Sequence, residues 1–516
     1  MTNLEVITMK ISFKKAFTLG VLAFVCHTAY GKTITYDTDL AVVGGGSVGL
    51  AAAVTGAEAG LHVIVLEKKP YLGGSSNFAE GLFAVESDYQ RGKSYGLTKD
   101  QAYEHIMEYS HFNNNAALER EFVDESADNL RWLNKFGVEF NVVQISPKEP
   151  QTWHLIQTRQ QWVHGAALVT ALQTAAQKDG VKFMMRTPAQ SLIYEKGRVS
   201  GVRAKDHKGN DVVINAKAVI IGTGGFGNSP EKINEWTHFD GKAFRPTLPL
   251  NKTGDGIQMG RDVGAAHEGE TLMLHPGTQG KGIVPLGNIY TMTWQPANIW
   301  VNAHGDRFVD ETVAFSFAHA GNAIGRQKDH YAWAIFDQAE LDHAKNDGID
   351  NGVGVLVPVM TKLSNIDNEI KNALAVNSES FKQANNIEQL AKEISVPVKN
   401  LKQAYESYNY AAKTHYDEAF NKDRVWLHPI DNGKLYAVKL MPYHFTSVGG
   451  LRINPKMEVV NTDDAPIKGL YAGGNDVAGL YSDTYTLWAS GHAFGFATYS
   501  GRKAAQNAIN EIKSGK

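Results

Sequence analysis

The sequence predicts an α/β fold that begins with a strand, a helix and a second strand, and three observations support this prediction. Residues 40–43 are a short apolar run, which is typical of a buried strand. A glycine-rich turn follows at once and leads into small residues, 47–59, that suit a closely packed helix. A second apolar run, residues 62–66, ends in Glu67. Strand, helix and strand in this order form the βαβ unit of a parallel sheet.

The turn has the G-x-G-x-x-G spacing at Gly44, Gly46 and Gly49. The first glycine permits the tight turn, the second lets the backbone approach a pyrophosphate, and the third lets the helix pack against the strand. The helix N-terminus offers free N–H groups to phosphates, and Glu67 can accept hydrogen bonds from a ribose. A glycine turn alone is weak evidence, but here every part occurs in order. The predicted dinucleotide site contains Gly44, Gly46, Ser47, Val48, Gly49 and Glu67.

A second glycine-rich turn, residues 73–81, suits a long cofactor extended along the backbone. It resembles the FAD-binding segment of the fumarate reductase and succinate dehydrogenase flavoprotein family, which also contains urocanate reductase and the 3-ketosteroid dehydrogenases. The resemblance extends over residues 35–507 through the segments GTGGF (222–226), TGDG (253–256), HP (275–276), RFVDE (307–311) and GLYAGGN (469–475). It implies FAD as the cofactor. It also implies further FAD-binding residues: Lys68, Gly74, Ser75, Ser76, Ala79, Glu80, Gly81, Gly224, Asp255, Asn475, Ala493 and Phe494.

The attachment of the flavin also follows from the resemblance. Family members in membrane complexes bind the flavin covalently through a histidine, where this chain has Ser75-Ser76-Asn77-Phe78. The resemblance therefore implies noncovalent FAD. It further implies that residues 490–495 begin a helix whose N-terminus faces the pyrimidine end of the flavin and stabilises its anionic reduced form. The alternative is that Gly491 and Gly495 only allow close packing.

Composition sets the general class of the protein. The chain has 516 residues, enough for two or three domains, with 43% hydrophobic and 20% charged residues. These shares are ordinary for a soluble globular protein. The net charge of −3 and the absence of runs of like charge give no indication of a nucleic-acid partner. No metal site is predicted.

The N-terminus predicts export. Lys10, Lys14 and Lys15 precede an apolar segment, residues 16–25, and small residues follow at Ala29 and Gly31. This pattern is typical of a secretory signal peptide and is too short for a membrane anchor. We therefore expect a signal peptide at residues 1–31 and a periplasmic or secreted mature chain without a transmembrane segment.

The cysteine content restricts the redox chemistry. The chain has one cysteine, Cys26, and it lies within the predicted signal peptide. A lipoprotein interpretation of Cys26 is weak, because the preceding Val25 is bulky. The mature chain then has no disulfide, no c-type haem and no cysteine-bound iron–sulfur cluster. We expect the electrons to come from a separate protein, such as a cytochrome or another flavoprotein.

The motifs predict the domain organisation. The FAD-binding motifs lie toward both ends of the chain, and a different segment separates them. The expected architecture is a Rossmann-like FAD-binding domain at residues 33–272 and 441–516 with an inserted α+β capping domain at residues 273–440. The family resemblance implies that the cap closes over the flavin, and ligand sites commonly lie between domains.

At the positions that bind substrate in fumarate reductases, this chain has uncharged residues in place of ionisable ones. Phe315 stands in place of the arginine proton donor, and Trp294 lies in a stretch that lacks the family's charged relay. Thr446 stands in place of a carboxylate-binding histidine, and Trp488 falls near the second carboxylate-binding arginine. Because the cationic clamp for a dicarboxylate is missing, we expect a substrate with more apolar or aromatic surface.

A proton donor must replace the missing arginine. By resemblance to the ketosteroid dehydrogenases, Tyr481 and Tyr485 are candidates, since a tyrosine can protonate a carbon or bind a carbonyl oxygen. His275 matches a family position that faces the substrate. The alternative is that both tyrosines only pack or contact an aromatic ring, and that the histidine is structural. Glu311 is expected to be structural, because its downstream arginine partner is missing.

The function predicted from these features is reduction of a C=C bond conjugated to a carbonyl or carboxylate, as in an anaerobic respiratory reductase. The substrate is expected to be a small unsaturated organic molecule. One alternative is a ketosteroid-type dehydrogenase, and another is a flavin-binding electron carrier without an organic substrate. The inserted cap and the aromatic residues disfavour the carrier. NADH and NADPH are not expected to be efficient donors, because only one complete dinucleotide fingerprint occurs.

Overall fold

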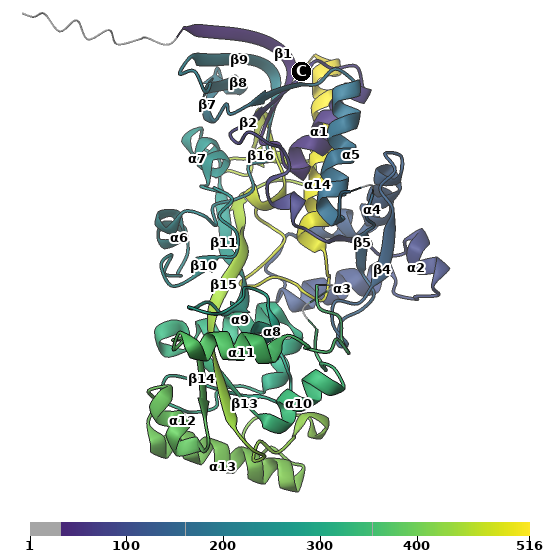
Figure 1. The fold of residues 1–516 in the computed structure, drawn as a ribbon. Coiled ribbons are helices and arrows are strands. Elements are labelled where there is room, and N and C mark those ends of the chain that lie inside the picture. Colours follow the sequence, from purple (N-terminus) through teal and green to yellow (C-terminus); the bar gives the residue numbers. More distant parts are fainter. Residues whose placement is uncertain (1–31, 160, 353, 355, 516) are drawn as a thin grey trace, which may run out of the picture.

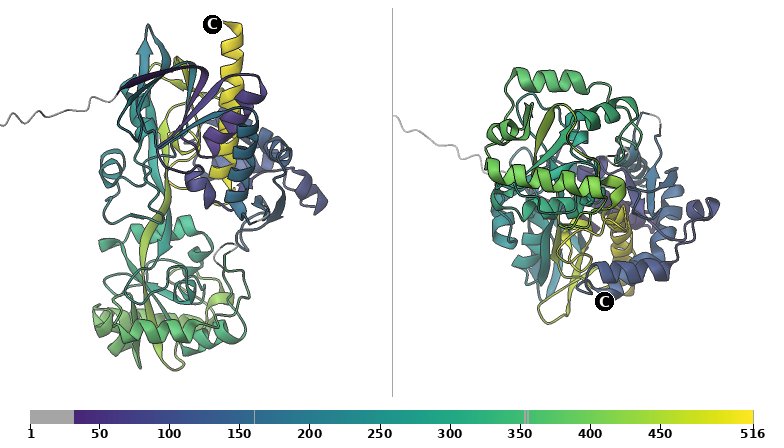
Figure 2. Two further views of the ribbon diagram at one scale, coloured as in Figure 1. Left: turned by 45° about the horizontal axis from the view of Figure 1, so that its top comes forward. Right: turned by 90° about the horizontal axis from the view of Figure 1, so that it is seen from below.

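Two large sheets lie toward opposite ends of the molecule in this computed structural model, as Figures 1 and 2 show. The structure describes residues 32–159, 161–352, 354 and 356–515, so the signal peptide predicted at residues 1–31 lies outside the described residues. Within the described ranges, no helix is long and apolar enough to cross a membrane.

The first sheet has eight strands in the order β16-β17-β8-β9-β1-β2-β6, with β7 paired to β8. Its centre is parallel: β9, β1, β2 and β6 run together, and β17 also pairs with β9 in parallel. The strands are β1 (Thr33–Val43), β2 (Val63–Glu67), β6 (Lys182–Met185), β7 (Ala189–Glu195), β8 (Arg198–Lys205), β9 (Asp211–Ile221), β16 (Glu458–Val460) and β17 (Pro466–Ala472). The predicted strand–helix–strand unit is confirmed, and β2 is buried throughout, as expected of a strand covered on both faces.

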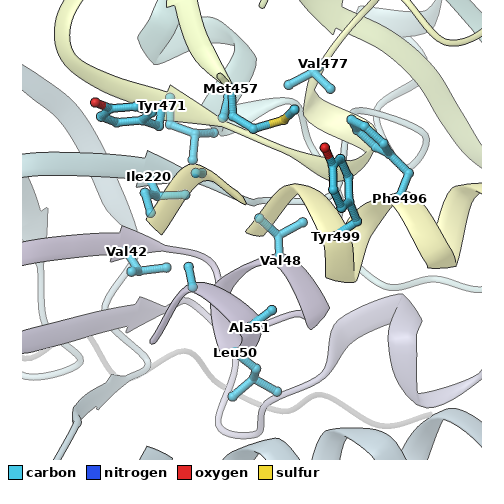
Figure 3. Packing of buried hydrophobic residues seen from close by; sticks show 14 of the residues in the cluster. Val42, Val48, Leu50, Ala51, Ile220, Met457, Tyr471, Val477, Phe496 and Tyr499 are labelled. Carbon is cyan, nitrogen blue, oxygen red and sulfur yellow. The ribbon is translucent and has the colours of Figure 1, made fainter. Parts of the chain in front are cut away.

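Three helices pack beside one another along this sheet: α1 (Ser47–Glu58), α5 (His164–Lys178) and α14 (His492–Ser514) (Figure 1). Their close approach requires glycine. A Cβ on Gly49 would lie 1.9 Å from the Gly44 carbonyl oxygen, and one on Gly501 would lie 2.2 Å from that of Val48. Figure 3 shows the core that results, with Val48 of α1 near Tyr499 of α14.

The remaining elements form two groups. The six-stranded sheet contains β10 (Arg245–Pro246), β11 (His267–Gly277), β12 (Ile299–Val301), β13 (Ala332–Asp337), β14 (Phe381–Ala384) and β15 (Leu435–Leu451). The helices of the cap region are α8 (Asn288–Met292), α9 (Phe317–Gly325), α10 (Gln338–Asn346), α11 (Ile366–Ala375), α12 (Ile387–Glu393) and α13 (Val398–Thr414). A three-stranded sheet contains β3 (Gly81–Phe83), β4 (Phe140–Val143) and β5 (Trp153–Ile156), and it lies with the helices α2 (Asp88–Gly92), α3 (Lys99–Tyr109) and α4 (Ala116–Asn134). Two further helices, α6 (Pro230–Trp236) and α7 (Asp255–Asp262), precede β11 in the chain.

Strand β15 connects the two ends of the molecule (Figure 1). Its first part pairs with β13, where Leu440 lies opposite Ala332, and its second part pairs with β11, beginning with Met441 opposite Gly277. The expected domain boundary at residue 441 coincides with this change of partner. The other expected boundary, at residue 273, falls inside β11. The chain thus passes between the two regions through paired strands, and the division into domains stays a prediction.

Candidate active site

A cavity of about 410 Å³ begins at the glycine turn after β1 and extends to the cap. Its walls come from residues 44–81, from the turn after β9, from residues 273–356, and from the start of α14. Such a volume is in the usual range of ligand sites, and its lining includes the turns at the carboxyl ends of the parallel strands β1 and β9. The position therefore matches the general location of nucleotide sites in open α/β sheets.

The glycine turn leaves an open cradle at the start of α1. A Cβ on Gly46 would meet only Gly73 O at 3.8 Å and Ser76 Oγ at 3.9 Å, so the backbone is open to a close ligand. The N-cap residue of α1, Gly46, has no side chain to cap the helix, and the N–H of Ser47 is bonded to Ser76 Oγ at 3.1 Å. Free N–H groups and the positive end of the helix dipole favour a phosphate here.

Glu67 is held in place beside the turn. Its Oε2 accepts a hydrogen bond from the Gly45 N–H at 2.9 Å, and its Oε1 accepts one from the Lys69 N–H at 2.7 Å. A carboxylate has about four acceptor positions, so capacity for a ribose hydroxyl remains. The donor set and the cradle therefore fit the phosphates and ribose of a bound dinucleotide.

The structure brings most of the predicted cofactor residues together. Those that line the cavity are Gly44, Gly46, Ser47, Val48, Glu67, Lys68, Gly74, Ser75, Ser76, Ala79, Glu80, Gly81, Gly224, Asn475, Ala493 and Phe494. Two do not line it. Gly49 packs against the Gly44 carbonyl, and Asp255 lies behind the wall, where it forms a 2.6 Å ion pair with Lys68. Gly49 thus serves helix packing, as the motif predicts, whereas Asp255, predicted to bind FAD, contacts Lys68 instead of lining the cavity.

The N-terminus of α14 faces the cavity, through Gly491, Ala493 and Phe494. Gly491 also packs closely against neighbouring backbone, as the alternative interpretation of this glycine predicts. Its φ is 83°, and a Cβ there would lie 2.5 Å from the backbone carbon of Leu82. Both interpretations of this segment are therefore compatible with the structure: glycine allows the approach, and the approach places the helix terminus at the cavity.

The end of the cavity nearest the cap is aromatic. Tyr290 and Trp294 meet edge to face at 5.8 Å, Phe317 meets Phe445 at 5.4 Å, and Phe315 completes the wall. In the part of the chain that the structure describes, no arginine lines this cavity. Trp488 lies outside the wall, stacked on His105 at 4.0 Å. Trp294 and Phe315 thus line the cavity, and their replacement of the family's cations stays a prediction.

Tyr485 lines the cavity, whereas Tyr481 does not. The Tyr485 hydroxyl accepts a hydrogen bond from the N–H of Ala493 at 3.4 Å, in the first turn of α14. Burial raises the pKa of Tyr485 to about 12, and N–H groups of residues 491–493 oppose this rise. The hydroxyl is therefore protonated at neutral pH, and the helix terminus is placed to stabilise the oxygen after proton donation.

Tyr481 belongs to a buried chain behind the wall. His492 lies with Nε2 2.8 Å from Glu119 Oε1 and with Nδ1 2.9 Å from the Tyr481 hydroxyl. Nε2 thus pairs with the Glu119 carboxylate, and Nδ1 pairs with the Tyr481 hydroxyl. The Tyr481 hydroxyl is thereby engaged by His492. The two tyrosine rings lie 5.4 Å apart, so the pair links this chain to the cavity wall.

His275 lines the cavity, but its ring nitrogens are both engaged. Nδ1 lies 2.7 Å from the Pro276 carbonyl oxygen and Nε2 lies 2.6 Å from the Thr247 hydroxyl. The ring stacks on Phe445 at 4.1 Å, and burial lowers the pKa of His275 to about 4. The side chain is thus neutral and oriented by the protein, which favours a role in shaping the cavity over proton donation.

Glu311 occupies the structural position expected for it. Its carboxylate is fully buried and lies 2.8 Å from Arg307 Nε and 3.2 Å from Lys422 Nζ, while Arg307 also pairs with Asp417 at 3.0 Å. The neighbouring cations hold the pKa of Glu311 below its usual range against the effect of burial. The R-F-V-D-E segment therefore anchors the cap through a buried ion cluster.

Lys252 lines the cavity and was not among the residues predicted from the sequence. It is buried, and its Nζ donates to the Phe445 carbonyl at 3.2 Å. Its place directly before the TGDG segment is the one available signal. That signal does not distinguish a cavity lysine from an exposed one, because burial depends on residues 444–446 far along the chain.

The fold and the site together define a flavoprotein of the dinucleotide-binding α/β class. The chain belongs to the FAD binding domain family, whose model matches residues 39–491. It binds FAD and is a flavin-dependent oxidoreductase.

Relatives of known activity cover most of this chain. Vinyl phenol reductase of Lactiplantibacillus plantarum is 35% identical over 91% of this chain and 96% of its own length. NADH:fumarate oxidoreductase of Klebsiella pneumoniae is 27% identical over 91% of this chain but only 48% of its own length. Urocanate reductase of Eggerthella lenta is 26% identical over 86% of this chain and 70% of its own length.

Solved structures share the fold. A flavocytochrome c3 fumarate reductase in its open conformation aligns with a TM-score of 0.69 and 24% identity, over 94% of this chain and 79% of that one. The 3-ketosteroid delta1-dehydrogenase of Sterolibacterium denitrificans aligns with a TM-score of 0.75 and 21% identity, over 93% of this chain and 100% of that one. The predicted Rossmann-like FAD-binding fold is confirmed.

Proposed function

We propose that this chain reduces a C=C bond in a substrate with an aromatic or otherwise apolar body, conjugated to the group that activates the alkene. The observation that carries the proposal is the aromatic wall at the cap end of the cavity, which contains Trp294 and Phe315. The family resemblance predicts that these residues stand where fumarate reductases carry cations. A dicarboxylate would lose charge-assisted hydrogen bonds in such a site. The 35% identity to a vinyl phenol reductase supports an aryl alkene as the substrate class.

FAD, when bound, supplies the hydride for such a reduction. The residues that hold it are those of the glycine turns, Glu67 and the start of α14. Tyr485 is placed to give a proton to the neighbouring substrate carbon, because its hydroxyl is protonated and lies in the cavity wall. The Ala493 N–H at 3.4 Å then stabilises the tyrosine oxygen. The aromatic side chains exclude water and orient the substrate.

The electron source in this proposal is a separate redox protein, such as a cytochrome or flavoprotein. The one cysteine of the chain is Cys26, so cysteine-bound haem and iron–sulfur groups have no ligands beyond that position. The proposal also includes export and noncovalent FAD, as the sequence predicts. Residues 75–78 offer no histidine for a covalent flavin bond.

A dehydrogenase acting on a ketosteroid-like ring is the second candidate. Tyr485 favours it, because the tyrosinate oxygen that remains after proton donation in reduction is the base that accepts a proton in the reverse direction. Direction of turnover separates the two candidates. A carrier without an organic substrate is disfavoured by the aromatic end of the cavity, which such a carrier does not need.

The test is anaerobic reoxidation of the chemically reduced holoprotein. Para-vinylphenol, a cinnamate-type acid, urocanate, fumarate and a steroid enone are each mixed with the reduced protein, and recovery of the oxidised flavin absorbance is followed. We expect an aryl alkene to reoxidise the flavin far faster than fumarate does. Faster reoxidation by fumarate would contradict the proposal, and reoxidation by none would favour the electron carrier. Reduction of the oxidised protein by a saturated ketosteroid would favour the dehydrogenase.

A further inference from the structure

Lys252 is a buried lysine of the cavity wall without a carboxylate in contact. Its exposed fraction is 6%, and its Nζ makes one hydrogen bond, 3.2 Å long, to the carbonyl oxygen of Phe445. Among the described residues, no Asp or Glu oxygen lies within the 4.0 Å of an ion pair. A neutral carbonyl is therefore its direct partner in the protein.

The ionisable groups nearest to Lys252 do not form a direct ion pair with it. Asp476 attracts it from a distance, but its carboxylate already accepts hydrogen bonds from the backbone N–H groups of Thr223, Gly224 and Gly225 and from the Thr223 hydroxyl. Burial also raises the pKa of Asp476. His444 is buried with both ring nitrogens unpartnered among the described residues, and burial lowers its pKa to about 3, so it is neutral.

Burying a cation without an opposite charge is costly, so buried charges are normally paired. Lys422 shows the ordinary solution in the same molecule, because its fully buried Nζ lies 3.2 Å from Glu311. Lys252 differs in facing the cavity, where a Cβ on Gly224 would lie 3.5 Å from its Cδ. Its missing counter-charge can therefore come from the occupant of the cavity.

We propose that Lys252 is the counter-charge to an anionic group of bound FAD, either the pyrophosphate or the reduced isoalloxazine ring. Gly224, in the turn after β9, lies beside the Lys252 side chain on the cofactor side. The carbonyl that this side chain contacts belongs to Phe445, and the next residue, Thr446, accepts a hydrogen bond from the predicted FAD-binding residue Asn475 at 3.1 Å. The aromatic end of the cavity, in contrast, is built for uncharged surface. Burial lowers the pKa of Lys252 to about 8, and a nearby anion keeps it charged.

The test compares Lys252→Met, Lys252→Gln and Lys252→Arg with the wild type, by three measurements that need no substrate. The melting temperature of the FAD-free protein should stay equal or rise in Lys252→Met, because a buried charge is replaced by an apolar chain of similar length. Lys252→Gln provides a second neutral variant if the Met variant folds poorly. Lys252→Arg retains the charge. It should change the FAD affinity and the midpoint potential of the flavin less than Lys252→Met does.

The other two measurements, FAD affinity and midpoint potential, distinguish the pyrophosphate from the reduced ring as the source of negative charge. If the pyrophosphate is the partner, both neutral variants bind oxidised FAD about tenfold or more weakly. If the reduced ring is the partner, oxidised FAD binds normally and the midpoint potential falls. A tenfold loss of preference for the reduced form corresponds to about 30 mV for a two-electron couple.

Either result supports the proposal. Unchanged FAD affinity and unchanged potential in a folded neutral variant would overturn it, as would an arginine variant that matches the methionine variant in both. A rise in substrate KM with neither FAD property changed would assign Lys252 to the substrate and would also overturn it. Because the melting temperature, the FAD affinity and the midpoint potential are measured without turnover, failure here is distinct from failure of the proposed substrate class.

Discussion

Removing the hydroxyl of Tyr485 should abolish most of the turnover and leave FAD binding nearly intact. Tyr485 lines the cavity and is the protonated hydroxyl of the wall that the helix terminus can stabilise. Tyr481, four residues earlier in the same loop, points its hydroxyl at His492 instead. Tyr485→Phe and Tyr481→Phe are therefore a matched pair: the same atom is deleted, once in the wall and once behind it.

The expected magnitudes differ for the two variants. Loss of a general acid costs about 10²- to 10⁴-fold in turnover, or about 3–5 kcal/mol of barrier. The one hydrogen bond that Tyr485→Phe removes is a long 3.4 Å contact, so stability should fall by less than about 1 kcal/mol. Tyr481→Phe leaves the buried Nδ1 of His492 without its hydrogen-bond partner, which should cost about 1–3 kcal/mol of stability. The turnover of Tyr481→Phe should fall much less than that of Tyr485→Phe.

Both variants are compared by flavin content, thermal unfolding and single-turnover reoxidation with the substrate found in the panel assay. The reasoning is refuted if Tyr485→Phe retains wild-type turnover, or if the two variants lose turnover equally while both stay folded and loaded with FAD. His275 is the next candidate in that case. Its engaged ring nitrogens would then have to exchange partners during turnover.

Four further outcomes are expected. Acid or heat should release all of the yellow flavin into the supernatant, and Glu67→Ala should weaken FAD binding without unfolding the chain; flavin left on the precipitate would contradict noncovalent attachment. NADH should not reduce the flavin rapidly under anaerobic conditions, whereas a reduced viologen should; fast stoichiometric reduction by NADH would disprove this. Glu311→Gln should destabilise the chain by about 3–5 kcal/mol, because it disturbs a buried ion cluster with Arg307 and Lys422; a denaturant-unfolding midpoint equal to wild type would exclude that role. Burial raises the pKa of Glu149 to about 7, so the folded chain holds this proton more tightly and stability is lost as pH rises from the unfolded value through about 7. Glu149→Gln should therefore raise the melting temperature relative to wild type at about pH 8 but not at about pH 4, and equal shifts at both would refute the assignment.

Local sequence predicted the cofactor half of the site well. The turn at Gly44, Gly46 and Gly49 and the acid at Glu67 lie within one βαβ unit, and spacing within such a unit determines which atoms face the ligand. The structure confirms the unit as β1, α1 and β2 and places Gly46 and Glu67 in the wall. The prediction for Asp255 was less accurate. The motif does not show whether its carboxylate contacts the ligand directly or contacts Lys68, which lines the cavity.

The catalytic half was less accessible from the sequence. Tyr481 and Tyr485 are equivalent in the sequence, as two tyrosines of one short loop. The contact that separates them comes from His492 at the start of α14, and the carboxylate that orients His492 is Glu119 on α4. No periodicity or spacing connects these segments. They meet only because α4 and α14 pack together.

By itself, the sequence determined the βαβ unit and FAD as the cofactor, and it predicts the loss of the dicarboxylate clamp, because each depends on residue types at short, fixed spacings. Only the tertiary structure decided that Tyr485 rather than Tyr481 lines the cavity and that Lys252 is buried beside it. The physical reason is that exposure and pairing are properties of a whole environment. A hydroxyl or an ammonium group acquires its role from the distant segments that surround it, and those segments come together only when the chain folds.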